Sequence, residues 1–188
     1  MIKKVLKKTQ FRLVLAGLVL LGSSPCLAAE VELDGHGRLI SATPYDHQLK
    51  QTGILIAYGP GQNTRSADDL FNQARAFRYE ADPAGQDYWQ TPDETEARWA
   101  GDCEDKAVWL YAQLKDNGYR GVRLVVGRQN SVLQGFHVWV TLEDTGGTGF
   151  YVLDPTMMKR IWHSTDFPEG YYRPLYSFDG LNRYRHDR

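Results

Sequence analysis

The segment from Trp99 to Asn117, WAGDCEDKAVWLYAQLKDN, is the clearest structural signal in the chain. Four of its apolar side chains recur at helical spacing and form one stripe: Ala107, Leu110, Tyr111 and Leu114. Such a stripe is typical of an amphipathic helix that packs on a core. Asp102 is suited to cap the first turn, and Asn117-Gly118 is suited to end the last one. The pattern therefore places Cys103 at a helix N-terminus.

The residues after this helix predict strands. Residues 122–126 form a short segment rich in β-branched side chains. The side chains of residues 136–143 alternate between two faces, and His137 shares one face with Trp139, Thr141 and Glu143. Residues 150–153 form a return strand that ends at Asp154-Pro155, because proline cannot continue a strand ladder. We therefore expect an α+β domain in which the helix that carries Cys103 packs on an antiparallel sheet.

Weaker signals lie on both sides of this region. A helix is expected over residues 67–79, with Ser66 at its start. Residues 54–58 fit either a strand or a short helix, since periodicity cannot separate the two over so few residues. About twenty residues at the C-terminus are rich in Tyr, Arg, Gly and Pro, which predicts an irregular tail with aromatic anchors.

The hairpin brings a histidine and a carboxylate together if its register is right. When residues 144–147 form the turn and Glu143 lies opposite Thr148, His137 falls opposite Asp154. Directly opposed Cβ atoms lie about 4.5–5.5 Å apart, close enough for an imidazole to reach a carboxylate. A slip of one residue would send the two side chains to opposite faces.

The N-terminal segment has the pattern of a secretory signal peptide. Five basic residues precede the apolar run 13–21, which is followed by small residues. The run is shorter than the roughly 20 residues that span a bilayer. We expect cleavage of residues 1–29, a periplasmic or secreted protein without a membrane anchor, and a single domain over residues 30–188. A lipid anchor on Cys26 is the alternative, although Pro25 is atypical of lipoprotein signals.

Cleavage would change both the charge and the cysteine count. Five of the 22 basic residues lie in the signal segment and all 23 acidic residues lie beyond it, so the mature chain carries a net charge of about −6. That charge argues against nucleic acid or anionic lipid as a partner. Cys26 would leave with the signal, so Cys103 would be the only remaining thiol. A lone exported thiol is either buried and inert or kept for its reactivity.

Cys103, His137 and Asp154 together have the chemistry of a nucleophile, a base and an orienting acid. A thiol at a helix N-terminus beside an imidazolium is expected to have a lowered pKa. Each residue also has a purely structural interpretation: an inert buried thiol, a structural strand histidine and a turn aspartate.

Three segments resemble the motifs of the transglutaminase-like superfamily: WAGDCEDKAVWL at 99–110, GFHVWV at 135–140 and YVLDPT at 151–156. The resemblance covers about residues 70–156 and is closest to the bacterial transglutaminase-like cysteine proteinases, periplasmic enzymes that clip surface adhesins. It implies a papain-like core and assigns Cys103, His137 and Asp154 as the catalytic triad. The chain before the cysteine is short for that group, which puts an adhesin substrate in doubt.

The same resemblance implies calcium beside the cysteine. In those relatives the flanking acids help to hold the ion, so Asp102 and Glu104 are candidate ligands, and oxygen ligands suit Ca²⁺. The alternative is that Asp102 only caps the helix and Glu104 only interacts with its dipole. Three tryptophans have a similar ambiguity, since they either line the cleft or belong to the core: Trp89, Trp99 and Trp139.

We therefore expect an exported cysteine peptidase that acts on a protein, such as an envelope or surface protein, and needs no cofactor for the chemistry itself. One alternative is a transglutaminase that transfers the acyl group of a glutamine side chain to an amine. The other is a non-catalytic, calcium-dependent binding module on the same fold, with Cys103 inert.

Overall fold

A computed structural model describes residues 32–33, 37–62, 64–130, 135–146 and 149–187. The predicted signal peptide and Cys26 lie outside these residues. Within the described ranges, no helix has the length and apolar character that a membrane crossing needs.

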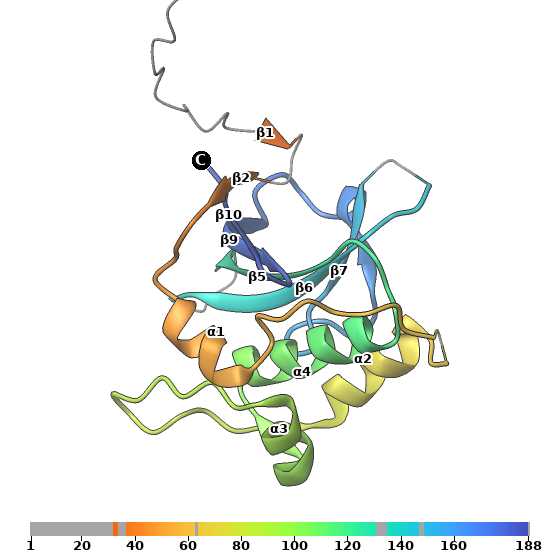
Figure 1. The fold of residues 1–188 in the computed structure, drawn as a ribbon. Helices are drawn as coiled ribbons and strands as arrows, with labels where there is room; N and C mark the ends of the chain where they lie inside the picture. Colours follow the sequence, from red (N-terminus) through yellow and green to blue (C-terminus); the bar gives the residue numbers. More distant parts are fainter. Residues whose placement is uncertain (1–31, 34–36, 63, 131–134, 147–148, 188) are drawn as a thin grey trace, which may run out of the picture.

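An antiparallel sheet forms one layer of the protein (Figure 1). Its strand order is β1-β2-β10-β9-β5-β6-β7-β8, so the two C-terminal strands lie inside the sheet. The strand bounds are β1 Glu32–Leu33, β2 Gly37–Ile40, β5 Val122–Gln129, β6 His137–Glu143, β7 Phe150–Leu153, β8 Trp162–His163, β9 Tyr172–Asp179 and β10 Asn182–Arg185.

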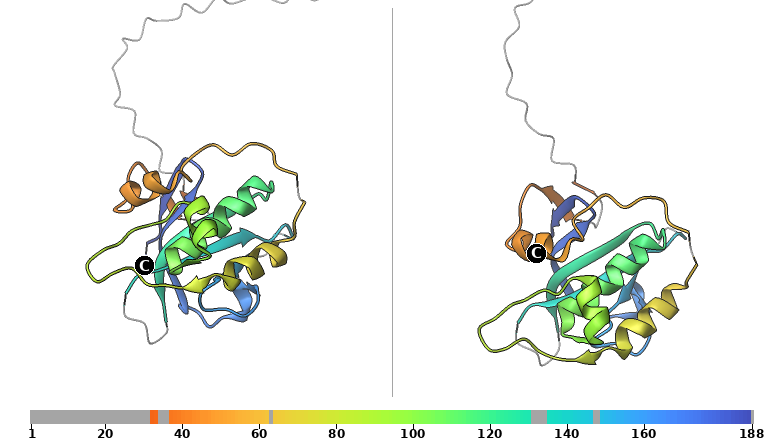
Figure 2. Two further views of the ribbon diagram at one scale, coloured as in Figure 1. Left: turned by 90° about the horizontal axis from the view of Figure 1, so that it is seen from below. Right: turned by 60° about the horizontal axis from the view of Figure 1, so that its bottom comes forward.

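The helices gather on one side of the sheet, with α4 between the strands and the outer helices (Figures 1 and 2). Their bounds are α1 Asp46–Thr52, α2 Ala67–Ala76, α3 Pro92–Arg98 and α4 Cys103–Asp116, with a short 3-10 helix at Ser164–Asp166. A separate parallel pair joins β3, Arg78–Tyr79, to β4, Ala100–Gly101, directly before α4. The fold is thus α+β with the cysteine helix packed on an antiparallel sheet, as predicted.

The core lies between α4 and the central strands. All four predicted stripe residues are at most 1% exposed, and they pack in one cluster with Leu124, Val126 and Val140 of the sheet. Val108 and Trp109 on the other side of α4 are also fully buried, because α2 and α3 cover that side. Helix α4 is therefore buried on two sides, whereas the apolar stripe predicted burial on one side only.

Two of the weaker sequence expectations differ from the structure. The helix expected over residues 67–79 ends at Ala76, because Arg78 leaves it to pair with Ala100 and donates its backbone N–H to the Trp99 carbonyl at 3.0 Å. Residues 54–58 form neither a strand nor a helix.

The prediction of an irregular C-terminal tail is wrong. Strand β9 pairs with β5 on one side and β10 on the other, and Phe178 in β9 is fully buried. Proline is usually excluded from an inner strand, but Pro174 pairs with Gly127 where the β5–β9 register shifts, and bulges accommodate proline. A Cβ at Gly127 would lie 2.2 Å from the Arg173 carbonyl oxygen, so this close pairing requires glycine.

The predicted hairpin register is wrong by two residues. Glu143 pairs with Phe150 and Val140 with Leu153, so the connection between the strands is two residues longer than expected. Thr148, the predicted partner of Glu143, lies outside the described residues. Because side chains alternate with a period of two, a two-residue shift keeps every side chain on its predicted face. Asp154, the residue after Leu153, therefore lies at the level of Trp139 and on the face of His137.

Candidate active site

Cys103 is the first residue of α4, and Asp102 occupies the N-cap position as predicted. The Asp102 backbone N–H donates to Asp105 Oδ2 at 3.2 Å. Gly101 makes this possible, since a Cβ there would lie only 2.5 Å from the Asp105 Cβ. The glycine of the GDCED sequence thus lets the chain turn tightly into the helix that presents the thiol.

Asp105 also holds a distant loop against the start of α4. Its Oδ1 accepts the Gln90 backbone N–H at 2.8 Å and its Oδ2 accepts the Gln90 side-chain amide at 2.6 Å. Burial is the main cause that raises the pKa of Asp105, to about 7. The local pattern of the sequence gives no sign of this contact, because Gln90 lies 15 residues away.

His137 and Asp154 form the predicted pair. His137 Nε2 lies 2.7 Å from Asp154 Oδ2, and the Asp154 side chain is fully buried. The other carboxylate oxygen, Oδ1, accepts the backbone N–H groups of Thr156 and Met157, each at 3.0 Å. Because Asp154 occupies Nε2, the imidazole has Nδ1 left to act on a substrate or a nucleophile.

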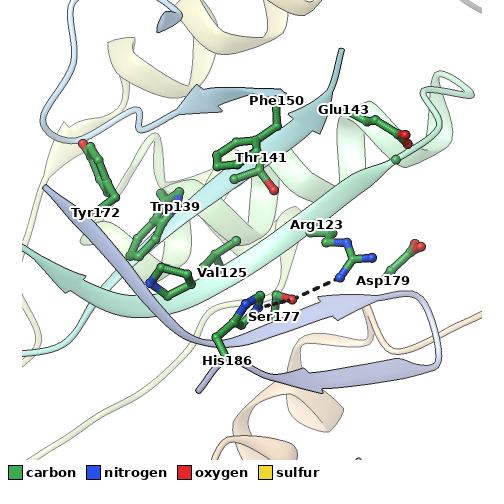
Figure 3. A pocket seen from close by; sticks show the side chains of 12 residues that line it. Arg123, Val125, Trp139, Thr141, Glu143, Phe150, Tyr172, Ser177, Asp179 and His186 are labelled. Carbon is green, nitrogen blue, oxygen red and sulfur yellow. Dashed lines mark hydrogen bonds between the residues drawn. The ribbon is translucent and has the colours of Figure 1, made fainter. Parts of the chain in front are cut away.

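One cleft contains both Cys103 and His137. It has a volume of about 440 Å³, and Tyr79, Gln129 and Met157 also form its walls. The thiol and the imidazole therefore line the same hollow, although they lie 34 residues apart in the chain. Neither residue lines the second hollow, of about 260 Å³, which is bordered by Trp139 and Tyr172 (Figure 3).

Lys106 lines the cleft of Cys103 and His137 as well, although the helical pattern placed it away from the apolar stripe. It is only 4% exposed, and its ammonium donates to the carbonyl of Phe77 at 3.1 Å and that of Arg75 at 3.5 Å. Burial lowers its pKa. These hydrogen bonds link the end of α2 to α4 and hold the segment that leads to Tyr79, another residue that lines the cleft.

The electrostatic surroundings of the thiol are the reverse of those expected from the sequence. Cys103 Sγ donates a hydrogen bond to Glu104 Oε2 at 3.0 Å. Burial raises the pKa of Cys103, and the nearby carboxylates of Glu104 and Asp102 raise it further. The predicted lowering of this pKa by the helix N-terminus is therefore wrong for this arrangement, because burial and the two carboxylates outweigh the helix N-terminus.

These acids belong to a larger group of carboxylates. One oxygen each of Asp82, Asp87 and Glu104 lie within 4.8 Å of one another. Asp102 Oδ1 is buried and has no hydrogen-bond partner among the described residues. Burial, followed by the charge of Glu104, raises the pKa of Asp102 to about 8, and burial raises that of Glu104.

Sequence reasoning proposed Asp102 and Glu104 as metal ligands but missed Asp82 and Asp87. Both lie in the turn-rich segment between β3 and α3, and only the fold brings that segment to the start of α4. A group of ligands that are all oxygens suits Ca²⁺. The buried Asp102 oxygen without a hydrogen-bond donor has lone pairs available to coordinate such a cation.

The three tryptophans have different environments. Trp89 and Trp139 are each 2% exposed and belong to the core, whereas Trp99 is 47% exposed and packs edge-on against Phe77, with 4.7 Å between the ring centroids. Trp139 stacks on the His137 ring, with 6.1 Å between centroids, and so supports the histidine from the side.

Comparisons with known proteins give a fold relationship. No protein-family profile and no curated sequence matches the chain. Three structures of LapG from Legionella pneumophila do match, one of them calcium-bound and one EGTA-treated. For the calcium-bound form the TM-score is 0.55 at 24% identity, and for the EGTA-treated form it is 0.56 at the same identity. The matches cover 63 to 65% of this chain and 66% of LapG.

The matched part is therefore just under two thirds of the LapG chain, and at this identity the likeness concerns the fold. It agrees with the α+β arrangement described above, in which α4 packs on an antiparallel sheet. The chain has the papain-like fold of the transglutaminase-like cysteine proteinases, the group that its three sequence motifs resemble.

Proposed function

We propose that the protein is an exported cysteine peptidase that uses Cys103, His137 and Asp154. The observation that supports this most strongly is the shared cleft of Cys103 and His137, together with the buried His137–Asp154 pair behind it. A nucleophile, a base and an orienting acid in one hollow fit covalent hydrolysis of an acyl group.

The proposed reaction follows from the roles of the two imidazole nitrogens. Nε2–H donates to Asp154, so Nδ1 takes the proton of the Cys103 thiol as sulfur attacks the substrate carbonyl. Nδ1–H then protonates the leaving amine as the C–N bond breaks, which leaves a thioester on the cysteine. Water attacks the thioester and gives a proton to Nδ1, the C–S bond breaks to release the carboxylic acid, and Nδ1–H returns its proton to the Cys103 sulfur.

Calcium is the second part of the proposal, with Asp102, Glu104, Asp82 and Asp87 as its ligands. The support is the carboxylate group at the start of α4 and the existence of calcium-bound and EGTA-treated forms of LapG. Bound Ca²⁺ would supply positive charge against the carboxylates that otherwise raise the pKa of the thiol. In this role the ion controls the ionisation of Cys103 and takes no part in bond cleavage.

The substrate class and the location complete the proposal. The substrate is a protein, such as an envelope or surface protein, and the acidic net charge expected for the mature chain disfavours nucleic acid. A periplasmic or secreted location follows from the predicted signal peptide over residues 1–29.

A non-catalytic, calcium-dependent binding module is the second candidate. The observation that favours it is the Cys103–Glu104 hydrogen bond, because a thiol held by a carboxylate is protonated and inert at neutral pH. On this hypothesis calcium would shape a binding surface without activating the sulfur.

Incubation with a casein digest and an electrophilic peptide aldehyde tests the two candidates. A peptidase releases new N-termini, is blocked by the aldehyde in a Cys103-dependent way, and loses turnover in Cys103→Ala. If purified protein with calcium neither cleaves any member of a broad peptide library nor reacts with thiol-directed probes, the peptidase proposal fails and the binding module is favoured.

A further inference from the structure

Tyr172 contacts the candidate triad from a strand outside all three sequence motifs. It begins β9 and pairs with Gln129 of β5. Its hydroxyl donates to Asp154 Oδ2 at 2.8 Å, the same oxygen that His137 Nε2 approaches to 2.7 Å. Figure 3 shows the Tyr172 ring beside Trp139, the residue on which His137 stacks.

Among the described residues, four groups donate hydrogen bonds to the Asp154 carboxylate, and they divide into two kinds. Oδ1 accepts from the backbone N–H groups of Thr156 and Met157, which belong to the turn that Asp154 itself begins. Oδ2 accepts from His137 in β6 and from Tyr172 in β9. The local turn therefore holds Oδ1. Within the described part of the chain, Tyr172 is the second donor, beside His137, to Oδ2, the oxygen that faces the imidazole.

The environment of Tyr172 makes its hydroxyl a permanent donor. Burial raises its pKa, and so do the charge of Asp154 and the hydrogen bond to it. Gln129 acts in the opposite direction through a side-chain hydrogen bond to the same hydroxyl, so its amide donates to the phenol oxygen. The phenol proton is thereby directed to Asp154.

The ring of Tyr172 is also held in place. It packs edge-on against Trp139 with 5.0 Å between centroids and against Phe167 with 5.3 Å. A rigid aromatic side chain can hold its donor at a fixed point without further loss of rotamer entropy. Water cannot replace the donor easily, since Asp154 is fully buried.

We propose that Tyr172 is a positioning residue for the reaction, which fixes Asp154 Oδ2 so that Asp154 holds His137 in the tautomer with the proton on Nε2. This proposal rests on the proposed function, in which Nδ1 must be free to accept the thiol proton. Without the hydroxyl, Oδ2 keeps one buried lone pair without a donor and the carboxylate can turn about its Cβ–Cγ bond, which releases the imidazole from its orientation.

Tyr172→Phe tests the proposal, because it removes the hydroxyl and keeps the ring. The matched control is Tyr171→Phe, the neighbouring residue, whose ring packs against that of Tyr172 with 5.4 Å between centroids. In Tyr172→Phe we expect kcat to fall by about tenfold, the loss expected when one charge-assisted hydrogen bond is removed. KM should stay within about twofold, since the hydroxyl does not face the cleft. Tyr171→Phe should keep both constants.

A second measurement separates positioning from a structural role and does not need turnover. In a Cys103→Ala background, the ¹⁵N shifts of the His137 ring report its tautomer, and saturation transfer from water to the Nε2 proton reports the exchange rate of that proton. We expect Tyr172→Phe to speed that exchange by about tenfold and to mix the tautomers, and Tyr171→Phe to change neither.

An unchanged Nε2–H signal together with unchanged kcat would overturn the proposal. A fall in melting temperature with an unchanged tautomer would also overturn it, since Tyr172 would then be only structural. If the native protein hydrolyses no peptide, the proposed function fails, while the tautomer measurement still shows whether Tyr172 positions the His137–Asp154 pair.

Discussion

The thiol of Cys103 donates a hydrogen bond to the carboxylate of Glu104, its neighbour in α4, at 3.0 Å. This contact favours the protonated thiol, because a thiolate beside a carboxylate would be repelled. Reaction at neutral pH therefore requires that the negative charge beside the sulfur be offset.

Calcium should make Cys103 more reactive. We expect iodoacetamide to alkylate the EGTA-treated protein at least about tenfold more slowly at pH 7 than the calcium-loaded protein, because the ion lowers the pKa of the thiol. Glu104→Gln should alkylate faster than the native protein in EGTA and should lose most of its response to calcium. Asp93→Asn, a change at an exposed acid in α3, is the control. Equal rates with and without calcium would contradict the proposed role of the ion.

The calcium-free protein should lose stability as pH rises. The pKa of Asp102 is raised to about 8 and that of Asp105 to about 7, so the folded state holds protons that the unfolded state releases near pH 4. Where the folded state binds more protons, the free energy of unfolding falls with increasing pH. We expect this fall between about pH 4 and pH 8 in EGTA.

Chemical denaturation in EGTA over this pH range measures the effect. Asp102→Asn should make the free energy of unfolding less dependent on pH, since the amide does not titrate. Asp68→Asn, at an exposed position of α2, should leave the pH dependence unchanged. Calcium should offset the loss at high pH, because it binds the ionised carboxylates. A profile of Asp102→Asn that parallels the native one would show that Asp102 does not carry the effect.

Asp154→Asn should impair both stability and turnover. The carboxylate accepts hydrogen bonds from four donors that the structure describes: His137, Tyr172, Thr156 and Met157. In asparagine an NH₂ group replaces one of the two oxygens, so the donors on that side lose their acceptor and face another donor. We expect a loss of about 1–3 kcal/mol in the free energy of unfolding and at least a hundredfold fall in kcat. Urea denaturation and steady-state kinetics measure the two effects. Near-native turnover would remove Asp154 from the proposed mechanism.

Phe178→Ala should destabilise the protein strongly. Phe178 lies in β9, where it is fully buried and pairs with Leu124 of the neighbouring strand β5. Truncation of a buried phenylalanine costs about 3–5 kcal/mol in the free energy of unfolding, measured by urea denaturation. The control is Leu181→Ala in the turn before β10, where the side chain is 60% exposed and the expected change is below about 0.5 kcal/mol. A similar small effect at both positions would mean that β9 adds little to the core.

Cys103→Ala should abolish turnover while the chain stays folded. Removal of the nucleophile of a covalent mechanism costs several orders of magnitude in kcat, and the thiol is only partly buried. Circular dichroism and thermal melting check the fold, and release of new peptide N-termini checks the activity. Full turnover on a verified substrate would disprove the assignment of the nucleophile.

The local sequence predicted the elements whose signal lies within one segment. The apolar stripe of α4 and the residues at its start placed Cys103 at a helix N-terminus. Alternation along β6 put His137 and Trp139 on one face, and this survived an error of two in the register because the period of a strand is two. The C-terminal strands were missed because Pro174 and several half-exposed aromatic residues hide the alternation of β9.

By itself, the sequence predicted which residues would serve as nucleophile, base and acid, since each lies in a short motif with its own helix or strand pattern. Only the tertiary structure decided which groups surround them. Tyr172 reaches Asp154 from 18 residues away, and Asp82 and Asp87 approach Glu104 through the loop before α3. Contacts of this kind depend on how separate segments pack, and no periodicity within a single segment records that packing.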